Sequence, residues 1–165
     1  MVRVTQIKVA SGKTLAQMEL LFRERAAQLR RGVLEKVADD IIRFSPVDTG
    51  TYIMAHAARG AESDAEADRS SRGRVRGRNA GQFRALALGN LKRSVASAAL
   101  QSAGEVWIQN RSEHAERVET LGWSAPLFGN PNASGRGPYH VYRNARGRVP
   151  AHVRSTAREM GFETR

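Results

Sequence analysis

Apolar residues recur at steps of three and four between Leu15 and Phe44, and this spacing predicts one long amphipathic helix. The stripe consists of Leu15, Met18, Phe22, Ala26, Leu29, Val33, Val37 and Ile41. Thr14 followed three residues later by Gln17 has the pattern of a capping box, which starts a helix. Gly32 is the weakest helix former in the run and marks where a bend would fall. A continuous helix of this length spans about 45 Å, so we expect it to pack on a sheet and on other subunits.

The helix is predicted to end at the segment Ser45-Pro46-Val47-Asp48-Thr49-Gly50. Proline pushes the preceding residue out of helical dihedrals and donates no backbone hydrogen bond, so the helix should stop near Phe44. Asp48 can bond its own backbone two residues on, and Gly50 can take a positive φ, so a tight turn should follow. The next residues, 51–54, suit a strand or a tightly packed segment.

Asp48-Thr49-Gly50 is also the triplet of aspartic proteases, in which two carboxylates share one proton. That chemistry needs a second carboxylate and an apolar strand that leads into the triplet. Here a helix and a proline precede it, and no second Asp-Thr-Gly or Asp-Ser-Gly occurs in the chain. The sequence therefore favours a structural turn over a protease site.

Two further segments differ from the helix in composition. Residues 2–10 alternate apolar and polar side chains with one slip, which predicts a short strand or an arm that adds to a sheet edge. Residues 57–81 are small and acidic, then basic, and we expect a flexible insertion loop there. Its candidate nucleic-acid contacts are Arg69, Arg72, Arg74, Arg76 and Arg78. No aromatic residue is interleaved with them for base stacking, so a solvated loop is the commoner interpretation.

The second half of the chain predicts a helix over residues 82–100, with a weak point at Gly89-Asn90, and a strand over residues 105–109. Residues 114–119 suit either a short helix or a strand. Residues 124–138 hold most of the chain's prolines and should form a long loop, and residues 139–142 suit a strand or a helix start. Pro150 at a first helical position and Gly161 as a stop predict a short C-terminal helix.

These elements predict one α+β domain over residues 1–165. A long N-terminal amphipathic helix would pack on a small, mainly antiparallel sheet, with a disordered arginine-rich insertion and a short C-terminal helix. Hydrophobic residues make up 41% of the chain but many are alanine, so the core should be modest. That leaves room for stabilisation by neighbouring subunits.

Few residues carry catalytic or metal-binding chemistry. The chain has no cysteine, and its histidines, His56, His114, His140 and His152, show no metal-ligand spacing, so we expect no metal and no cofactor. No phosphate-binding loop or nucleophile elbow occurs. His114, Glu116 and Glu119 are the one tight titratable cluster, suited to proton transfer or a divalent cation, but no nucleophile lies nearby. Absence of an apolar run of about 20 residues points to a soluble protein made in a cytoplasm.

Two stretches together resemble one family. The segment Ser45–Gly50 after a long amphipathic helix is similar to the signature of tail-completion, or minor tail, proteins of long-tailed bacteriophages, of the lambda Z type. The strand ending at Asn110, followed by residues 114–119 and Gly122-Trp123-Ser124, resembles the family's second run. The chain departs from that run in two places: His114 replaces the usual aromatic residue, and one extra residue precedes Gly122.

The resemblance implies a non-enzymatic virion protein, present in the host cytoplasm during assembly and then in the neck or tail. Such a protein forms a ring, sixfold if it follows the tail tube, that joins the tail tube to the head connector. Because tryptophan is enriched in buried interfaces, the expected subunit contacts are Trp107, Glu116, Glu119, Gly122 and Trp123. The alternative is an arginine-rich nucleic-acid-binding protein, since the net charge of +11 favours an acidic partner. Contact with packaged DNA would then be blind to sequence.

Overall fold

The long N-terminal helix is present as predicted. The computed structural model describes residues 14–47, 50–60, 80–101, 104–113, 115–121 and 138–162. Helix α1 (Leu15–Phe44) is continuous through Gly32. Its capping box is complete: Gln17 N donates to Thr14 Oγ1 at 3.3 Å, and Thr14 N donates to Gln17 Oε1 at 3.0 Å. At the other end Ser45 is extended, with φ −68° and ψ 133°, which confirms the expected stop before Pro46.

The segment after the turn is a short helix, so of the two alternatives given for residues 51–54 the strand is wrong and the tightly packed segment is correct. Helix α2 (Thr51–Met54) begins after Gly50, which has a positive φ of 83°. Met54 N donates to the carbonyl of Gly50 at 3.0 Å and closes one helical turn. Tyr52 and Ile53 are neighbours in sequence and are both buried. A strand would have sent their side chains to opposite faces.

The sheet consists of two antiparallel strands, β1 (His56–Gly60) and β2 (Val106–Asn110). In the register His56 lies opposite Asn110 and Gly60 lies opposite Val106. Strand β2 confirms the predicted strand, whereas residues 57–60 of β1 fall inside the predicted insertion loop. The small residues of β1 have little strand propensity of their own; pairing with β2 and packing on α3 hold them extended. The predicted insertion was therefore too wide, and residues 61–79 lie outside the described residues.

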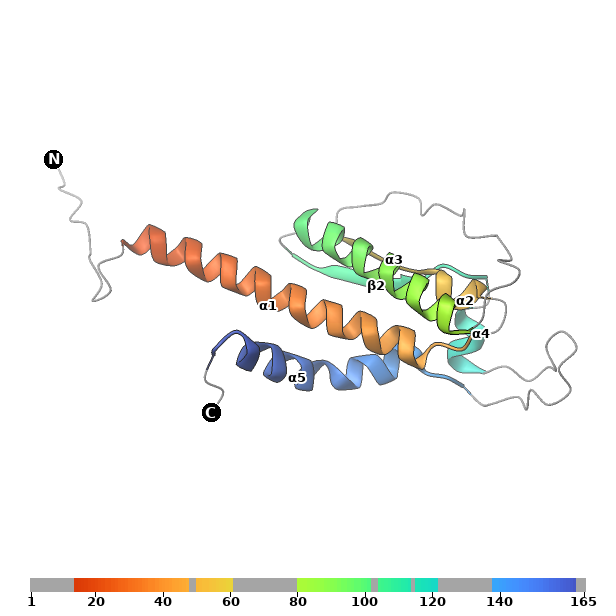
Figure 1. The fold of residues 1–165 in the computed structure, drawn as a ribbon. Coiled ribbons are helices and arrows are strands. Elements are labelled where there is room, and N and C mark those ends of the chain that lie inside the picture. The colour runs from red at the N-terminus through yellow and green to blue at the C-terminus, as the bar shows by residue number, and fades with distance from the viewer. Residues whose placement is uncertain are drawn as a thin grey trace, which may run out of the picture.

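Three further helices complete the fold (Figure 1). Helix α3 (Ala80–Gln101) passes through Gly89-Asn90 without interruption, and α4 (Ala115–Thr120) decides the ambiguous segment in favour of a helix. Helix α5 (Val141–Glu159) confirms the predicted C-terminal helix, but it contains Pro150 in its interior, so the predicted start at Pro150 was wrong. The packing of Val141, Ala145 and Ala157, all buried, holds the helix across the proline.

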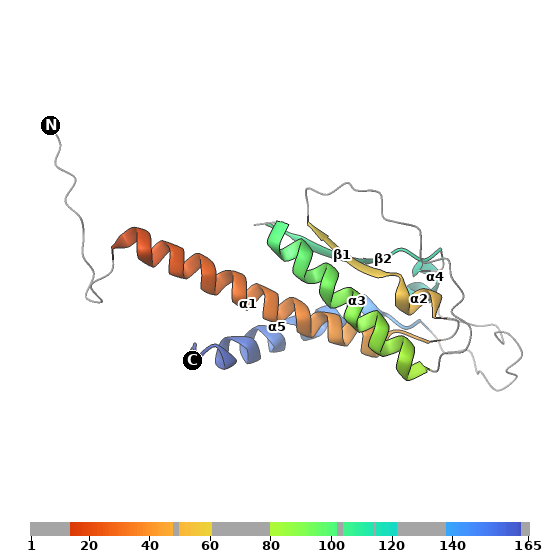
Figure 2. The same ribbon diagram turned by 45° about the horizontal axis from the view of Figure 1, so that its top comes forward.

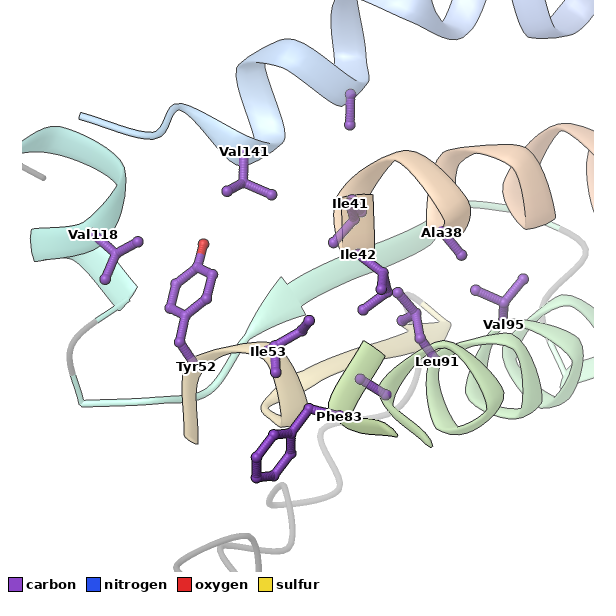
Figure 3. Close-up of a cluster of buried hydrophobic side chains, with 12 residues drawn as sticks. Ala38, Ile41, Ile42, Tyr52, Ile53, Phe83, Leu91, Val95, Val118 and Val141 are labelled. Atoms are coloured by element: carbon purple, nitrogen blue, oxygen red, sulfur yellow. The ribbon is translucent and has the colours of Figure 1, made fainter. Parts of the chain in front are cut away.

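Helix α1 runs between α5 and α3, and α3 lies along β1 (Figure 2). The core gathers at the C-terminal half of α1, where Ile41 and Ile42 belong to one buried cluster to which every other helix contributes residues (Figure 3). Ala58 and Ile108 pack against this cluster from the sheet. The predicted α+β architecture, a long helix on a small antiparallel sheet with a C-terminal helix, is thus confirmed.

A buried carboxylate joins α1 to α5. Asp40 is 5% exposed, and its oxygens lie 3.2 Å from Arg148 Nη1 and 2.6 Å from His152 Nε2. Lys36 adds an ion pair at 2.7 Å to Glu159 further along the same two helices. These contacts bind the antiparallel pair on its polar side, beside the apolar contacts of the core.

The strand predicted for residues 2–10 lies outside the described residues, and so does the long loop predicted for residues 124–138, apart from Pro138. No helix in the described ranges has the length and apolar character that crossing a bilayer requires.

Candidate functional site

The predicted turn motif lies in the packed end of the molecule, between the last turn of α1 and the start of α2 (Figure 1). Ser45 and Gly50 are buried, while Asp48 and Thr49 lie outside the described residues. Arg84 of α3 donates to the carbonyls of Ile42, Arg43 and Ser45, at 3.2 Å for Arg43 and 3.0 Å for Ser45. The last carbonyls of a helix have no partner within it and carry its negative dipole end. A cation from α3 therefore caps α1, a role that no sequence pattern indicated.

A chain of hydrogen bonds runs from this turn through His56. Ser45 Oγ lies 2.6 Å from the carbonyl of Ile41 and 2.7 Å from His56 Nε2. Because a carbonyl only accepts, the single hydroxyl proton of Ser45 goes to Ile41, and His56 Nε2–H must donate to Ser45 Oγ. His56 Nδ1 then accepts from the hydroxyl of Tyr142, 2.8 Å away. The direction of every proton in the chain follows from this one constraint.

The chain Ser45–His56–Tyr142 is structural. Burial lowers the pKa of His56 to about 3, so the imidazole is neutral at physiological pH. Burial and the nearby Glu119 charge raise the pKa of Tyr142 well above its usual value. Ser45 is 1% exposed, and the His56 nitrogen beside it carries hydrogen and cannot accept the hydroxyl proton. This serine–histidine pair therefore lacks the arrangement that activates a nucleophile.

A second set of bonds extends from Glu119 on α4. Tyr52 hydroxyl donates to Glu119 Oε1 at 2.6 Å, and the backbone N–H of Tyr142 approaches Glu119 Oε2 at 3.4 Å. Burial and then the hydrogen bond to Glu119 raise the pKa of Tyr52 strongly. Asn110 Nδ2 donates to the carbonyl of Tyr52 at 2.8 Å. The fold thus brings together the two stretches that carry the family resemblance, since Ser45 belongs to the first and Asn110 and Glu119 to the second.

Glu116 and Glu119 do not act together, although they are three residues apart. Glu116 is exposed, whereas Glu119 is half-buried and already bound to Tyr52. His114 lies outside the described residues. Within the described segments, no group of three or more acidic, histidine or cysteine side chains is placed to hold a metal ion. The placement of Glu119 supports a structural role; its part in a subunit interface stays a prediction.

The other predicted contacts divide between the surface and the part of the chain not described. Trp107 is 56% exposed on β2, with Arg59 opposite it on β1. Ile108, its neighbour, packs against the core. Gly122, Trp123 and the arginines between residues 69 and 78 lie outside the described residues. Of the predicted interface residues, Trp107 is therefore the one large apolar side chain whose exposure is established.

The first half of α1 lies outside the core, so its expected packing on other subunits stays a prediction. Figure 1 shows it projecting past α5 and α3. Between residues 15 and 28 every side chain is exposed except the half-buried Met18. Phe22 is 75% exposed and Leu15 is 56% exposed. The apolar stripe is continuous in sequence, but only its second half lies within the core.

Helix α5 presents a basic face. Arg143, Arg146 and Arg154 are all exposed and, at the helical repeat, lie within about 80° of one another around the axis. The sequence analysis concentrated on residues 69–78 and missed this face, although a spacing of three and then eight residues is the signal that marks it.

Comparison with protein-family models, with curated proteins and with solved structures gave no match to this chain.

Proposed function

We propose that the protein is a non-enzymatic structural component of a bacteriophage virion. It would act as a tail-completion or neck protein, forming a ring at the head–tail junction that joins the tail tube to the head connector. The proposal rests on the resemblance carried by residues 45–50 and 106–124, together with one structural observation. That observation is the exposed apolar stripe on the projecting half of α1.

The stripe supports a binding role because its pattern is regular. Leu15, Met18 and Phe22 continue, at helical spacing, the row that buries Ile41 in the core. Scattered apolar residues are normal on a protein surface, but a contiguous row marks a surface that another molecule covers. Most of the stability of a helix in a protein comes from packing of its apolar face. A partner on this half of α1 would complete that packing.

A ring is the assembly that fits this geometry. The projecting half of α1 and the body of the molecule are different surfaces, so a contact between them is heterologous and passes from one copy to the next. Such contacts close into a ring when the rotation per copy divides a full turn. Sixfold symmetry would match a sixfold tail tube.

Native mass spectrometry of the purified protein, alone and with the tail-tube protein, tests the proposal. We expect a closed homo-oligomer, or one that forms when the tail-tube protein is added. A chain that stays monomeric at micromolar concentration and binds no tail component would contradict the structural role.

The basic face of α5 supports a second candidate, nucleic-acid binding. Arginines on one helix face can contact successive phosphates. The net charge of +11 also attracts the negatively charged phosphate backbone. Binding to DNA should then weaken log-linearly with salt, with a slope near −0.9 per phosphate contacted.

Replacing Arg143, Arg146 and Arg154 with glutamine should flatten that slope if α5 carries the contacts. Deleting residues 69–78 should flatten it if the arginine cluster does. For a tail component we expect weak, sequence-blind binding. A sequence-specific complex that survives physiological salt would favour the second candidate over the first.

A further inference from the structure

The two edges of the sheet differ in what covers them. The backbone N–H of Ala58 on β1 donates to Ser94 Oγ of α3 at 3.0 Å, so it points away from β2 and α3 occupies that edge. Ile108 lies opposite Ala58 in the register. In an antiparallel pair, residues opposite each other either both bond across or both point outward. The N–H and C=O of Ile108 therefore point to the outer edge of β2.

The outer edge of β2 is open within the described part of the chain, where the sheet has two strands only. An open edge presents a row of unpaired donors and acceptors and is a template for another strand. Trp107, on the same strand, is 56% exposed, as expected of a side chain whose neighbouring strand is missing. Glu105 and Glu113, both exposed, place negative charge beyond the two ends of β2.

We propose that the outer edge of β2 binds residues 2–9 of a second copy of this chain as a third strand. The segment Val-Arg-Val-Thr-Gln-Ile-Lys-Val has the alternation of a half-buried strand and a charge opposite to that of Glu105 and Glu113. In this pairing Ile7 and Val9 lie on the same face of the sheet as Ile108, which packs against the core. Lys8 then lies on the opposite face, together with Trp107. Aromatic and β-branched neighbours across strands stabilise such a pairing, each by a small amount.

The position of α1 favours a second copy over the chain's own N-terminus. Arg30 Nη1 donates to the carbonyl of Gly104 at 2.6 Å, which places Arg30, near the middle of α1, beside the start of β2. Thr14 lies 16 residues before Arg30, or about 24 Å further along the helix axis. From Thr14 back to Val9 the chain reaches about 17 Å at full extension. Val9 of the same chain therefore falls short of β2, and Ile7, seven residues from Thr14, reaches about 24 Å at full extension, no further than the start of β2. The arm of a neighbouring copy has no such limit.

This inference deepens the proposed ring and rests on its self-association, but not on its place in a virion. It names a specific contact between copies: the N-terminal arm of one chain on the β2 edge of the next. Because each copy has one arm and one edge, the contact is heterologous and is compatible with ring closure.

The full-length variant Ile7→Pro/Val9→Pro tests the pairing, because proline donates no backbone hydrogen bond and is tolerated in an edge strand only where its nitrogen faces solvent. The matched control is Ile7→Val/Val9→Ile, which keeps both the strand propensity and the apolar face. Sedimentation velocity over a concentration series should show association in the natural sequence and in the control. In the proline variant we expect association to weaken at least tenfold.

A synthetic peptide of residues 1–13, titrated into the proline variant, identifies the edge. The backbone amide signals of Val106 and Ile108 should shift in NMR spectra, and a peptide with the same two prolines should bind at least tenfold more weakly. Shifts confined to α1 would overturn the proposal.

Two other outcomes would also overturn it and can be told apart. If the prolines leave association unchanged, the strand pairing is rejected, and the apolar stripe of α1 remains as the contact that would form the ring. A chain that is monomeric at every concentration, with the Ile108 amide protected from hydrogen exchange, would reject self-association and show pairing within one chain.

Discussion

At the scale of single residues, glycine and histidine near the turn hold the conformation on which the core depends. Gly50 has a φ of 83°, in the left-handed region that side-chain-bearing residues rarely adopt. A Cβ on Gly50 would also overlap the buried ring of Phe83. Both the backbone and the packing therefore require glycine at this position.

We expect Gly50→Ala to lower the free energy of unfolding by about 1–3 kcal/mol, through backbone strain and overpacking. Gly89→Ala is the matched control, because Gly89 lies within α3 and a Cβ there would meet no atom within 4 Å. The control should raise stability by up to about 1 kcal/mol. Urea denaturation monitored by circular dichroism measures both, and an equal effect of the two substitutions would contradict the account of Gly50.

His56 predicts a pH dependence of stability. Its pKa is about 3 in the folded chain against 6.5 in the unfolded chain, because burial opposes the charged form. As the pH falls below 6.5, His56 binds a proton in the unfolded state but not in the folded state, so the free energy of unfolding falls. From pH 6 to pH 5 the His56 contribution should approach about 1.4 kcal/mol per pH unit.

Comparison of urea midpoints for the natural sequence and His56→Gln isolates this contribution, because the other histidines are the same in both proteins. Glutamine keeps a donor toward Ser45 but does not titrate in this range. The variant should be less stable at pH 7 and show a shallower loss toward pH 5. Identical slopes would mean that His56 is protonated in the folded protein.

At the scale of elements, α1 has two halves with different environments. The C-terminal half is packed by α3 and α5, and Gly32 marks a close approach between α1 and α5. A Cβ on Gly32 would lie 2.6 Å from Thr156 Cγ2. In the sequence Gly32 indicated a bend. In the structure it instead allows α1 and α5 to touch.

Phe22→Asp should abolish self-association and leave the unfolding free energy of the monomer within about 0.5 kcal/mol, because Phe22 is 75% exposed. Gln28→Asp adds the same charge on an exposed site off the stripe and should leave association unchanged. Size-exclusion chromatography with light scattering gives the mass of each variant. Equal masses for all three proteins would show that the stripe is not the contact surface.

At the scale of the whole molecule, a small core lies at one end and a long helix projects from it. This shape suits a subunit that reaches its neighbours, and the exposed Trp107 lies on the sheet rather than on α1. The two surfaces, the stripe of α1 and the face of Trp107, are available to different partners in an assembly.

If the protein is the proposed tail component, Trp107→Ala should leave the monomer folded but reduce joining of heads and tails during virion assembly, since a large exposed aromatic side chain contributes more to an interface than to the fold. Electron microscopy of particles made with the variant would show separate heads and tails. Arg59→Ala, on the opposite strand, tests whether the effect belongs to the tryptophan. Normal particles with Trp107→Ala would exclude this face from the junction.

Helices α1 and α3 could be predicted from the sequence because their signals are local. The capping box at Thr14 and Gln17, the stop at Pro46 and the spacing of α3 each act within a few residues. Strand β1 and the interior Pro150 could not be predicted. The short run His-Ala-Ala-Arg-Gly becomes a strand through its pairing with β2, and α5 tolerates Pro150 through its contacts with α1.

Of the candidate site, the sequence indicated the turn at residues 45–50 and the exposed Trp107 but not the bonds beneath them. His56 and Tyr142 are 86 residues apart, and Tyr52 and Glu119 are 67 apart, so no spacing relates them. The sequence indicated Glu119 as a subunit contact. In the fold its carboxylate accepts a hydrogen bond from the Tyr52 hydroxyl.

The sequence by itself determined where α1 begins and ends, that a turn follows it, and which residues form the apolar stripe, because these depend on periodicity and on proline and glycine dihedrals. Only the tertiary structure decided which half of that stripe is core. Periodicity reports that a helix has an apolar face, but burial depends on whether another element lies against it. Helices α3 and α5 cover α1 from about Leu29 onward and leave Leu15 and Phe22 exposed.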